Sequence, residues 1–261
     1  MTEQENPDWQ PPPPPENIPQ ADPPQMSEVA SLGNVFIEPG RVFEDMRRKP
    51  RFLLAGLIAI AVISLFQIAF VEKVGLGEIV KARIESSKRT QDLSGEQKAT
   101  IIEQQSGPIA KYITFAATPI VIAIVFLLGG LIYWGASNAM GGDATFLRGV
   151  SVWVYSSFPP ALIFMIGNFI VLLLKSVDDI DLAHSQNGLL KANLGSFVDP
   201  NTSPVLAALL GSVDLFGIWG WILAAIGLQK VAKISSGAAW AVVLMVGLVG
   251  VVAKVVAAMF F

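Results

Sequence analysis

The sequence predicts an all-α protein, built as a polytopic bundle of five transmembrane helices. Two observations carry this prediction. Of the 261 residues, 52% are hydrophobic and only 15% are charged, whereas soluble domains average about 25% charged residues. The charges are also clustered, so that long intervals contain none. Since a helix needs roughly 20 apolar residues to cross a bilayer core about 30 Å thick, we expect lipid to surround most of the chain.

Five windows are long and apolar enough to span. The first contains no ionisable side chain, while the fourth contains one acid, Asp214, and the fifth contains one base, Lys254. Because five is an odd number, the two ends of this membrane domain should face opposite sides of the membrane. We expect a domain over 34–261 with spans at about 52–71, 113–137, 149–174, 205–228 and 237–260.

Residues 1–33 are expected to form a disordered, proline-rich tail. The first 30 residues contain neither lysine nor arginine and no apolar run, which excludes a cleavable signal peptide. The run from Pro11 to Pro15 favours an extended polyproline conformation, and such a segment can dock into an aromatic-lined groove of a partner protein. A simple spacer is the alternative.

Residues 34–50 are expected to form a short amphipathic helix in the plane of the membrane interface. The helix should begin near Pro39 and carry Val42, Phe43 and Met46 on one stripe. The apolar face would reach the acyl boundary, while the basic residues would meet anionic lipid. A mere stop-transfer anchor is the alternative. The basic residues lie off the stripe and are Arg41, Arg47 and Arg48.

Two segments should lie outside the lipid on the side opposite the N-terminus. Residues 72–111 mix bases and acids at near-helical spacing, and Ser94 and Gln97 form an S-x-x-Q capping box, so we expect one or two solvated helices there. The second loop, 175–204, is acidic and should be irregular.

Asp214 and Lys254 are the costly residues, since a charge at mid-bilayer costs about 2.5 to 3.5 kcal/mol on insertion scales. They lie at similar depths on consecutive spans. We therefore hypothesise that the two side chains pair and fix the register of the last two helices. In the alternative, Lys254 extends to the outer interface, and Asp214 stays protonated or bonds Ser212 or a neighbouring helix.

Prolines and small residues indicate how the helices meet. Pro119 in the second span and Pro159 and Pro160 in the third free backbone carbonyls and are expected to kink their helices. Small residues on shared faces should allow close helix contacts. These are Gly220 with Ala224, Gly135 with Ala139, and Gly250 with Ala253 and Ala257.

Charge density predicts the orientation. With the N-terminus inside, the inner segments hold eight basic residues in about 35 residues, whereas the outer segments hold nine in about 71. The density favours a cytoplasmic N-terminus and an external C-terminus, although the raw count does not.

Composition also limits the function. Eighteen basic against 21 acidic residues, a net charge of −3, leave no cationic surplus for nucleic acid. Cysteine is absent and histidine occurs once, as His184, so we expect no metal, no cofactor and no catalytic site. We expect a non-enzymatic membrane protein that organises lipid or protein partners, with self-association left open. A small transporter or channel subunit using Asp214 and Lys254 is the alternative.

Three stretches resemble the Yip family of five-span membrane proteins, specifically its bacterial branch. They are 34–50, 127–160 and 215–240, and the similarity covers roughly 34–261. The motif residues are Phe36, Pro39 and Phe43 in an F-x-x-P-x-x-x-F pattern, Gly141-Gly142 to Phe146, Ser157-Phe158-Pro159, Phe216-x-x-Trp219, and Gly227-Leu228.

The resemblance implies a helical bundle with a cytoplasmic N-terminus and no catalytic residue. Eukaryotic members are associated with Rab GTPases and vesicle traffic, but this chain lacks their D-L-Y-G-P signature, so an interaction with Rab proteins is not implied. The expected location is a bacterial cytoplasmic membrane, with an endoplasmic reticulum or Golgi membrane as the alternative.

Overall fold

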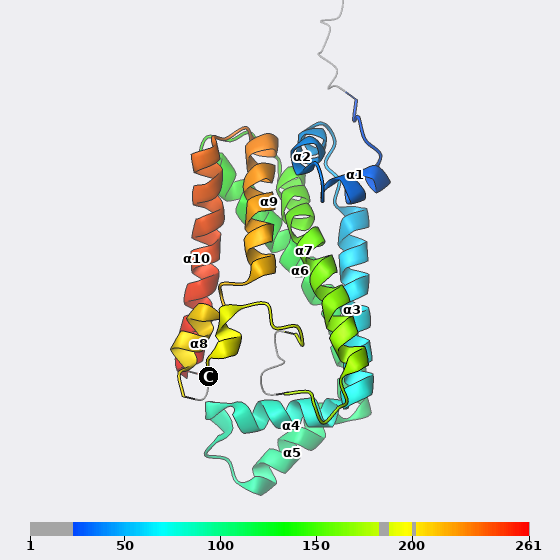
Figure 1. The fold of residues 1–261 in the computed structure, drawn as a ribbon, viewed down its shortest axis with the longest axis vertical. Coiled ribbons are helices and arrows are strands. Elements are labelled where there is room, and N and C mark those ends of the chain that lie inside the picture. Colours follow the sequence, from blue (N-terminus) through cyan, green and yellow to red (C-terminus); the bar gives the residue numbers. More distant parts are fainter. Residues whose placement is uncertain (1–22, 183–187, 200–201, 261) are drawn as a thin grey trace, which may run out of the picture.

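The computed structural model describes residues 23–182, 188–199 and 202–260. Within these ranges, five helices are long and apolar enough to cross a membrane, and they run along the long axis of the molecule (Figure 1). The prediction of an all-α, five-span bundle is therefore confirmed. The five are α3 (Leu53–Val74), α6 (Pro108–Ala139), α7 (Phe146–Leu174), α9 (Leu215–Ala232) and α10 (Ser236–Phe260).

The helix boundaries follow local backbone chemistry. Helix α6 begins with Pro108. Proline suits this position because the N–H that it lacks would have no carbonyl acceptor in the first turn of a helix. Gly75, with φ of 90°, ends α3, and Lys233, with φ of 55°, ends α9 in the left-handed conformation. A hydropathy window misses such signals, and α6 accordingly begins before the predicted residue 113.

The fourth span differs from the prediction. Instead of one helix over 205–228, the chain forms a short helix α8 (Pro204–Leu210), a turn, and then α9. The break comes where Gly211 and Ser212 form a turn and Asp214 becomes the N-cap residue of α9. An Asp in this position favours a helix start over a helix interior, because its carboxylate bonds the free N–H groups of the first turn.

Helix α7 is the centre of the bundle, where it packs against α3, α6 and α9. One buried apolar cluster joins side chains from α2, α3, α7, α9 and α10. By contrast, α6 exposes a long row of aliphatic side chains that suits contact with acyl chains. The row includes Ile120, Ile124, Leu127, Leu128 and Leu131.

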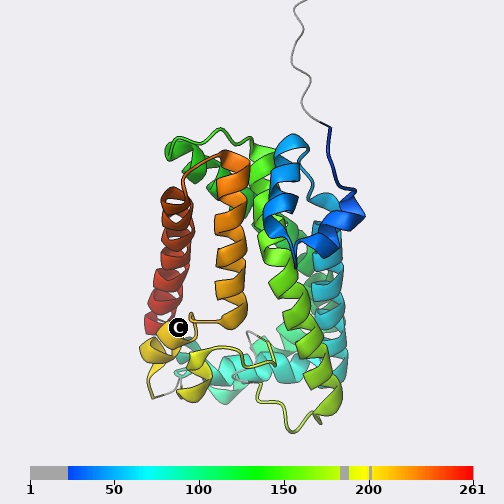
Figure 2. The same cartoon turned by 45° about the horizontal axis from the view of Figure 1, so that its top comes forward.

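The two ends of the bundle carry different structures (Figure 1; Figure 2). Helices α1 (Glu28–Asn34) and α2 (Pro39–Arg48) lie at one end, beside the α6–α7 and α9–α10 connections. Helices α4 (Leu76–Ser86) and α5 (Gly95–Ser106) lie across the other end, joined by a 3-10 turn, η1 (Lys88–Thr90).

The predicted capping box is confirmed. The Gln97 amide N–H donates to Ser94 Oγ over 3.2 Å, and the Ser94 N–H donates to Gln97 Oε1 over 2.9 Å. The described part of loop 175–204 contains one short 3-10 helix, η2 (Leu194–Phe197), before α8 begins.

The tail boundary also differs. Residues 28–33, expected to belong to a disordered tail, lie in helix α1, whose N-cap Ser27 accepts a hydrogen bond from the Ala30 amide. A short helix that gains its stability from packing on the bundle is not visible in a search for long apolar windows. The expectation for residues 1–22 concerns residues outside the described ranges.

Candidate functional site

Residues 23–51 form a folded N-terminal layer on one end of the bundle. Within it, α2 packs against α9 and α7, and its Val42, Phe43 and Met46 side chains are fully or almost fully buried. Protein therefore covers the apolar face that we expected to reach the acyl boundary, and this expectation is corrected. The amphipathic pattern shows that a helix has an apolar face, but the same pattern suits a bundle surface and a lipid surface.

The residues of the resemblance motifs meet in this layer. Phe36 lies edge-on to Phe158 of α7 and to Trp219 of α9, with ring centroids 6.2 and 6.0 Å away. Phe43 packs over Gly227 of α9, where a β-carbon would lie 3.0 Å from the ring. Pro39 is the first residue of α2 and sets the direction of the helix between these two phenylalanines.

A buried ion pair fixes the layer in place. Asp45 of α2 is 2% exposed, and its Oδ2 lies 3.2 Å from Nη1 of Arg51, which is itself almost buried. The backbone N–H groups of Gln25 and Met26 donate to the same carboxylate over 2.6 and 3.2 Å. Arg51 Nη1 also donates to Ser31 Oγ over 3.2 Å. The Asp45 carboxylate thus binds the backbone at Gln25 and Met26, and the Arg51 guanidinium binds Ser31 of α1.

The layer is also tied to the transmembrane helices. The Arg51 backbone N–H donates to Ser151 Oγ of α7 over 3.1 Å, and the Leu54 N–H at the start of α3 donates to Glu28 of α1 over 3.1 Å. Sequence reasoning missed this cluster. The available signal was an acid, Asp45, placed three residues after Val42 on the apolar stripe of an amphipathic helix.

The basic residues predicted for an interfacial face are partly engaged with protein. Arg41 pairs with Glu38 over 2.8 Å on the exposed side, and Arg48 lies 3.8 Å from Asp45. The backbone carbonyl of Arg47 accepts a hydrogen bond from Arg148 of α7. The outer side of α2 is therefore charged, while its inner side is bonded to and packed against the bundle.

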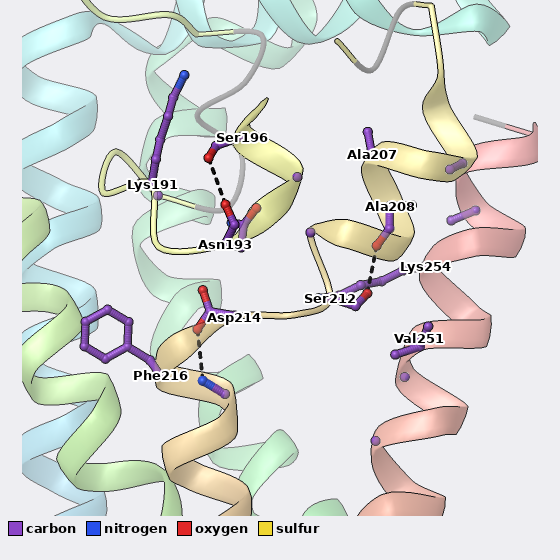
Figure 3. A pocket seen from close by; sticks show the side chains of 18 of the residues that line it. Lys191, Asn193, Ser196, Ala207, Ala208, Ser212, Asp214, Phe216, Val251 and Lys254 are labelled. Atoms are coloured by element: carbon purple, nitrogen blue, oxygen red, sulfur yellow. Dashed lines mark hydrogen bonds between the residues drawn. The ribbon is translucent and has the colours of Figure 1, made fainter. Parts of the chain in front are cut away.

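A cavity of about 1450 Å³ opens at the other end of the bundle, among α4, α6, α7, α8, α9, α10 and residues 188–199 (Figure 3). This volume exceeds the roughly 300 to 1,000 Å³ of common small-molecule sites. Polar residues line the part of the cavity near α8, and aromatic and small residues line the part deeper in the bundle. The polar group includes Lys191, Asn193, Ser196, Ser212, Asp214 and Lys254, and the deeper group includes Trp153, Trp221, Val243 and Gly247.

Asp214 and Lys254 both line this cavity, but they do not form the hypothesised pair. Among the ion pairs of the described residues, none joins them. Instead, Asp214 Oδ1 accepts the Gly217 N–H over 2.9 Å as the N-cap of α9, while Lys254 extends from α10 towards the α8–α9 connection (Figure 3). Because the carboxylate lies at a helix start, its position is explained without a basic partner.

The cap assignment predicts different effects for two substitutions of Asp214. Asparagine is an equally good N-cap, so Asp214→Asn should leave the free energy of unfolding nearly unchanged, whereas Asp214→Ala should lower it by about 1 kcal/mol. Unfolding in mixed micelles by added sodium dodecyl sulfate measures both. Lys254→Met, measured alone and combined with each Asp214 variant, tests whether the lysine contributes to the effect. An ion pair would instead lower the free energy of unfolding equally in the asparagine and alanine variants, and neither substitution would lower it further in a chain that already carries Lys254→Met.

The structure places the three prolines inside helices, Pro119 in α6 and Pro159 and Pro160 in α7. The kinks expected from them stay a prediction. Pro160 cannot donate to the carbonyl of Ser156, and a β-carbon on Gly220 of α9 would lie 3.5 Å from that oxygen. This is an ordinary contact distance, so α9 touches α7 here without an approach that only glycine allows.

No metal centre is evident in the part of the chain that the structure describes, where no three histidine, aspartate or glutamate side chains gather. His184 lies outside the described residues.

Comparisons with known proteins agree with this architecture. A family model described as the Yip1 domain matches residues 33–257, a range that begins just before Phe36 and ends within α10. Among curated proteins, "Membrane protein YknW" of Bacillus subtilis (strain 168) is 28% identical over 214 residues, which cover 82% of this chain and 84% of that protein. No solved structure matches the chain.

Proposed function

The chain belongs to the Yip1 family of membrane proteins, and from this premise we propose that it organises a partner protein at a bacterial cytoplasmic membrane without catalysing a reaction. The N-terminal layer is the observation that carries the proposal. It is folded onto the transmembrane helices by the Asp45–Arg51 pair and by Phe36 and Phe43, so it is a rigid base for the tail that precedes it.

The base fixes where a partner would be held. The backbone at Gln25 and Met26 is bonded to Asp45, which anchors the chain immediately after the tail. Residue 23 follows Pro15 by eight positions, and a chain of that length reaches at most about 28 Å. A domain that binds Pro11 to Pro15 would therefore stay within one domain diameter of the bundle end.

The proposal includes the orientation of the bundle. The end that carries the N-terminal layer also carries the α9–α10 connection, and their basic residues support a cytoplasmic location for this end. These are Arg41, Arg47, Arg48, Lys49, Lys230 and Lys233. The bacterial relative supports a bacterial membrane over an endoplasmic reticulum or Golgi membrane.

Site-specific photocrosslinking in living cells tests the role of the tail. With p-benzoylphenylalanine in place of Trp9, we expect a discrete adduct with a cytoplasmic protein, because the neighbouring proline run presents a preformed ligand. Replacing Pro12, Pro13 and Pro14 by alanine should reduce the adduct at least fivefold.

The matched control carries the same photoreactive residue in place of Ala99, an exposed position on α5 at the other end of the bundle, and should not give that adduct. An adduct that is unaffected by the alanine substitutions, or the same adduct from position 99, would contradict the proposal. Single cysteines at Val29 and Ala99 report the orientation in the same cells, because only the second should react with a membrane-impermeant maleimide.

The transporter or channel alternative stays an untested prediction. Asp214 and Lys254 line one cavity, as that alternative requires, but Asp214 caps a helix instead of pairing with the lysine.

A further inference from the structure

Three bases (Arg83, Lys191 and Lys254) and three acids (Asp181, Asp199 and Asp214) line the cavity near α8, but its two lysines are not paired with these acids. Lys191 and Lys254 line it, and neither ammonium forms an ion pair with any described residue. The acids of the cavity are engaged elsewhere. Asp214 caps α9, and Asp181 and Asp199 have interactions of their own.

Lys254 stands at the polar end of an open apolar strip. Gly247, Gly250 and Val251 line the same cavity and precede Lys254 by seven, four and three residues, which places all four on one face of α10. A β-carbon on Gly250 would meet no atom of the described residues within 4 Å, so none of them fills the space beside this glycine. Trp221 closes the strip on the inner side, where its ring lies against Gly247.

The two halves of the cavity demand one kind of occupant. Water alone leaves the strip of glycine, valine and tryptophan without apolar contact, while a purely apolar molecule provides no counter-ion for the exposed Lys254 ammonium. A molecule with an acidic group at one end and a hydrocarbon chain at the other satisfies both. The volume of about 1450 Å³ also suits a chain-bearing molecule better than a small solute.

We propose that this cavity binds one anionic amphiphile, with its phosphate or carboxylate at Lys254 and its acyl chain along Gly250 and Gly247 towards Trp221. Lys191 lies on another wall of the cavity, and its side chain is directed away from Lys254 (Figure 3). The site lies at the end of the bundle opposite the N-terminal layer, and it does not require a partner for the tail.

Native mass spectrometry of the full-length protein in a non-ionic detergent tests the headgroup. Four probes are added separately: phosphatidylglycerol, oleate, phosphatidylcholine and inorganic phosphate. We expect one retained molecule of phosphatidylglycerol or oleate per chain at concentrations where phosphatidylcholine and inorganic phosphate are not retained. Lys254→Gln should weaken the retained probe at least tenfold. Lys81→Gln, an exposed lysine on α4 that does not line the cavity, should not.

A second pair of variants tests the chain-binding strip. Gly250→Phe and Gly135→Phe both place a ring at a glycine whose β-carbon position is open, so both should fold, but only Gly250 lines the cavity. Gly250→Phe should reduce binding at least tenfold, and Gly135→Phe should leave it unchanged. Equal retention of phosphatidylcholine, retention of inorganic phosphate alone, or full binding by Gly250→Phe would each overturn the proposal.

Discussion

Replacing Asp45 by asparagine is expected to destabilise the protein by about 3 to 5 kcal/mol and to release the N-terminal layer from the bundle. The substitution preserves shape but removes the charge that faces Arg51 across 3.2 Å, and a buried guanidinium without a counter-ion costs far more than a lost surface pair. The released elements are residues 25–31, because Gln25 and Met26 donate to Asp45, and Ser31 accepts a hydrogen bond from Arg51.

Cysteine labelling reports this release directly, because the chain has no native cysteine. Val35 is fully buried, so a Val35→Cys chain should resist maleimide until the Asp45→Asn change is added, after which labelling should become at least tenfold faster. Unfolding by sodium dodecyl sulfate gives the free-energy difference.

Two further variants separate the ion pair from a general surface effect. Glu38→Gln removes an ion pair whose two side chains are both at least half exposed, and it should cost less than 1 kcal/mol. Adding Arg51→Met to Asp45→Asn should recover part of the lost stability, since the unpaired charge is then gone. Similar stabilities for Asp45→Asn and Glu38→Gln would show that the buried pair does not hold the layer.

The spans were predictable because they depend on local composition. Twenty uncharged residues in sequence are enough to identify a helix that crosses a bilayer, and the Ser94 and Gln97 pair is enough to identify the start of α5. Both signals lie within one or two helical turns, so neither depends on the rest of the fold.

The break before α9 was not predictable from the same window. An aspartate among apolar residues has the same pattern whether it lies inside a span or at the start of one. The structure distinguishes the cases through the Gly217 N–H that Asp214 accepts and the turn that precedes it. The ion-pair hypothesis therefore rested on a helix that the chain interrupts.

The N-terminal layer was not predictable for another reason. Asp45 and Arg51 are close in sequence, but their burial depends on Phe36 and Phe43 packing on α7 and α9, more than 100 residues away. The similarity to the Yip family drew attention to these phenylalanines without showing that they contact Phe158, Trp219 and Gly227. Contacts with α7 and α9, which are distant in sequence, bury the apolar face of α2 together with Asp45.

Small residues illustrate the same limit. We expected Gly135 and Gly250 to bring helices together, yet a β-carbon on either would meet nothing within 4 Å. The close crossing lies instead between α6 and α7, at Gly130 and Gly149. A β-carbon on Gly149 would lie 2.4 Å from the Gly130 carbonyl oxygen, and one on Gly130 would lie 2.6 Å from the Val150 α-carbon. Helical spacing alone does not show which glycine faces a neighbour.

This crossing leads to the second large effect. Gly130→Ala and Gly149→Ala should each lower the free energy of unfolding by about 1 to 3 kcal/mol, because the added methyl group meets backbone atoms that cannot rotate away. The distances are below any normal carbon contact, so the two helices must separate. Separation would also disturb Trp153, whose ring lies so close to Gly129 that a β-carbon there would be 2.0 Å from it.

Gly135→Ala is the matched control on the same helix. Its methyl group enters open space, and alanine is the better helix former, so this variant should be neutral or more stable by up to about 1 kcal/mol. Sodium dodecyl sulfate titration of the three variants under identical conditions gives the comparison. If Gly130→Ala and Gly149→Ala have the same free energy of unfolding as Gly135→Ala, α6 and α7 do not cross at these two glycines. Because α7 packs against α3, α6 and α9, the arrangement of the whole bundle would then need another explanation.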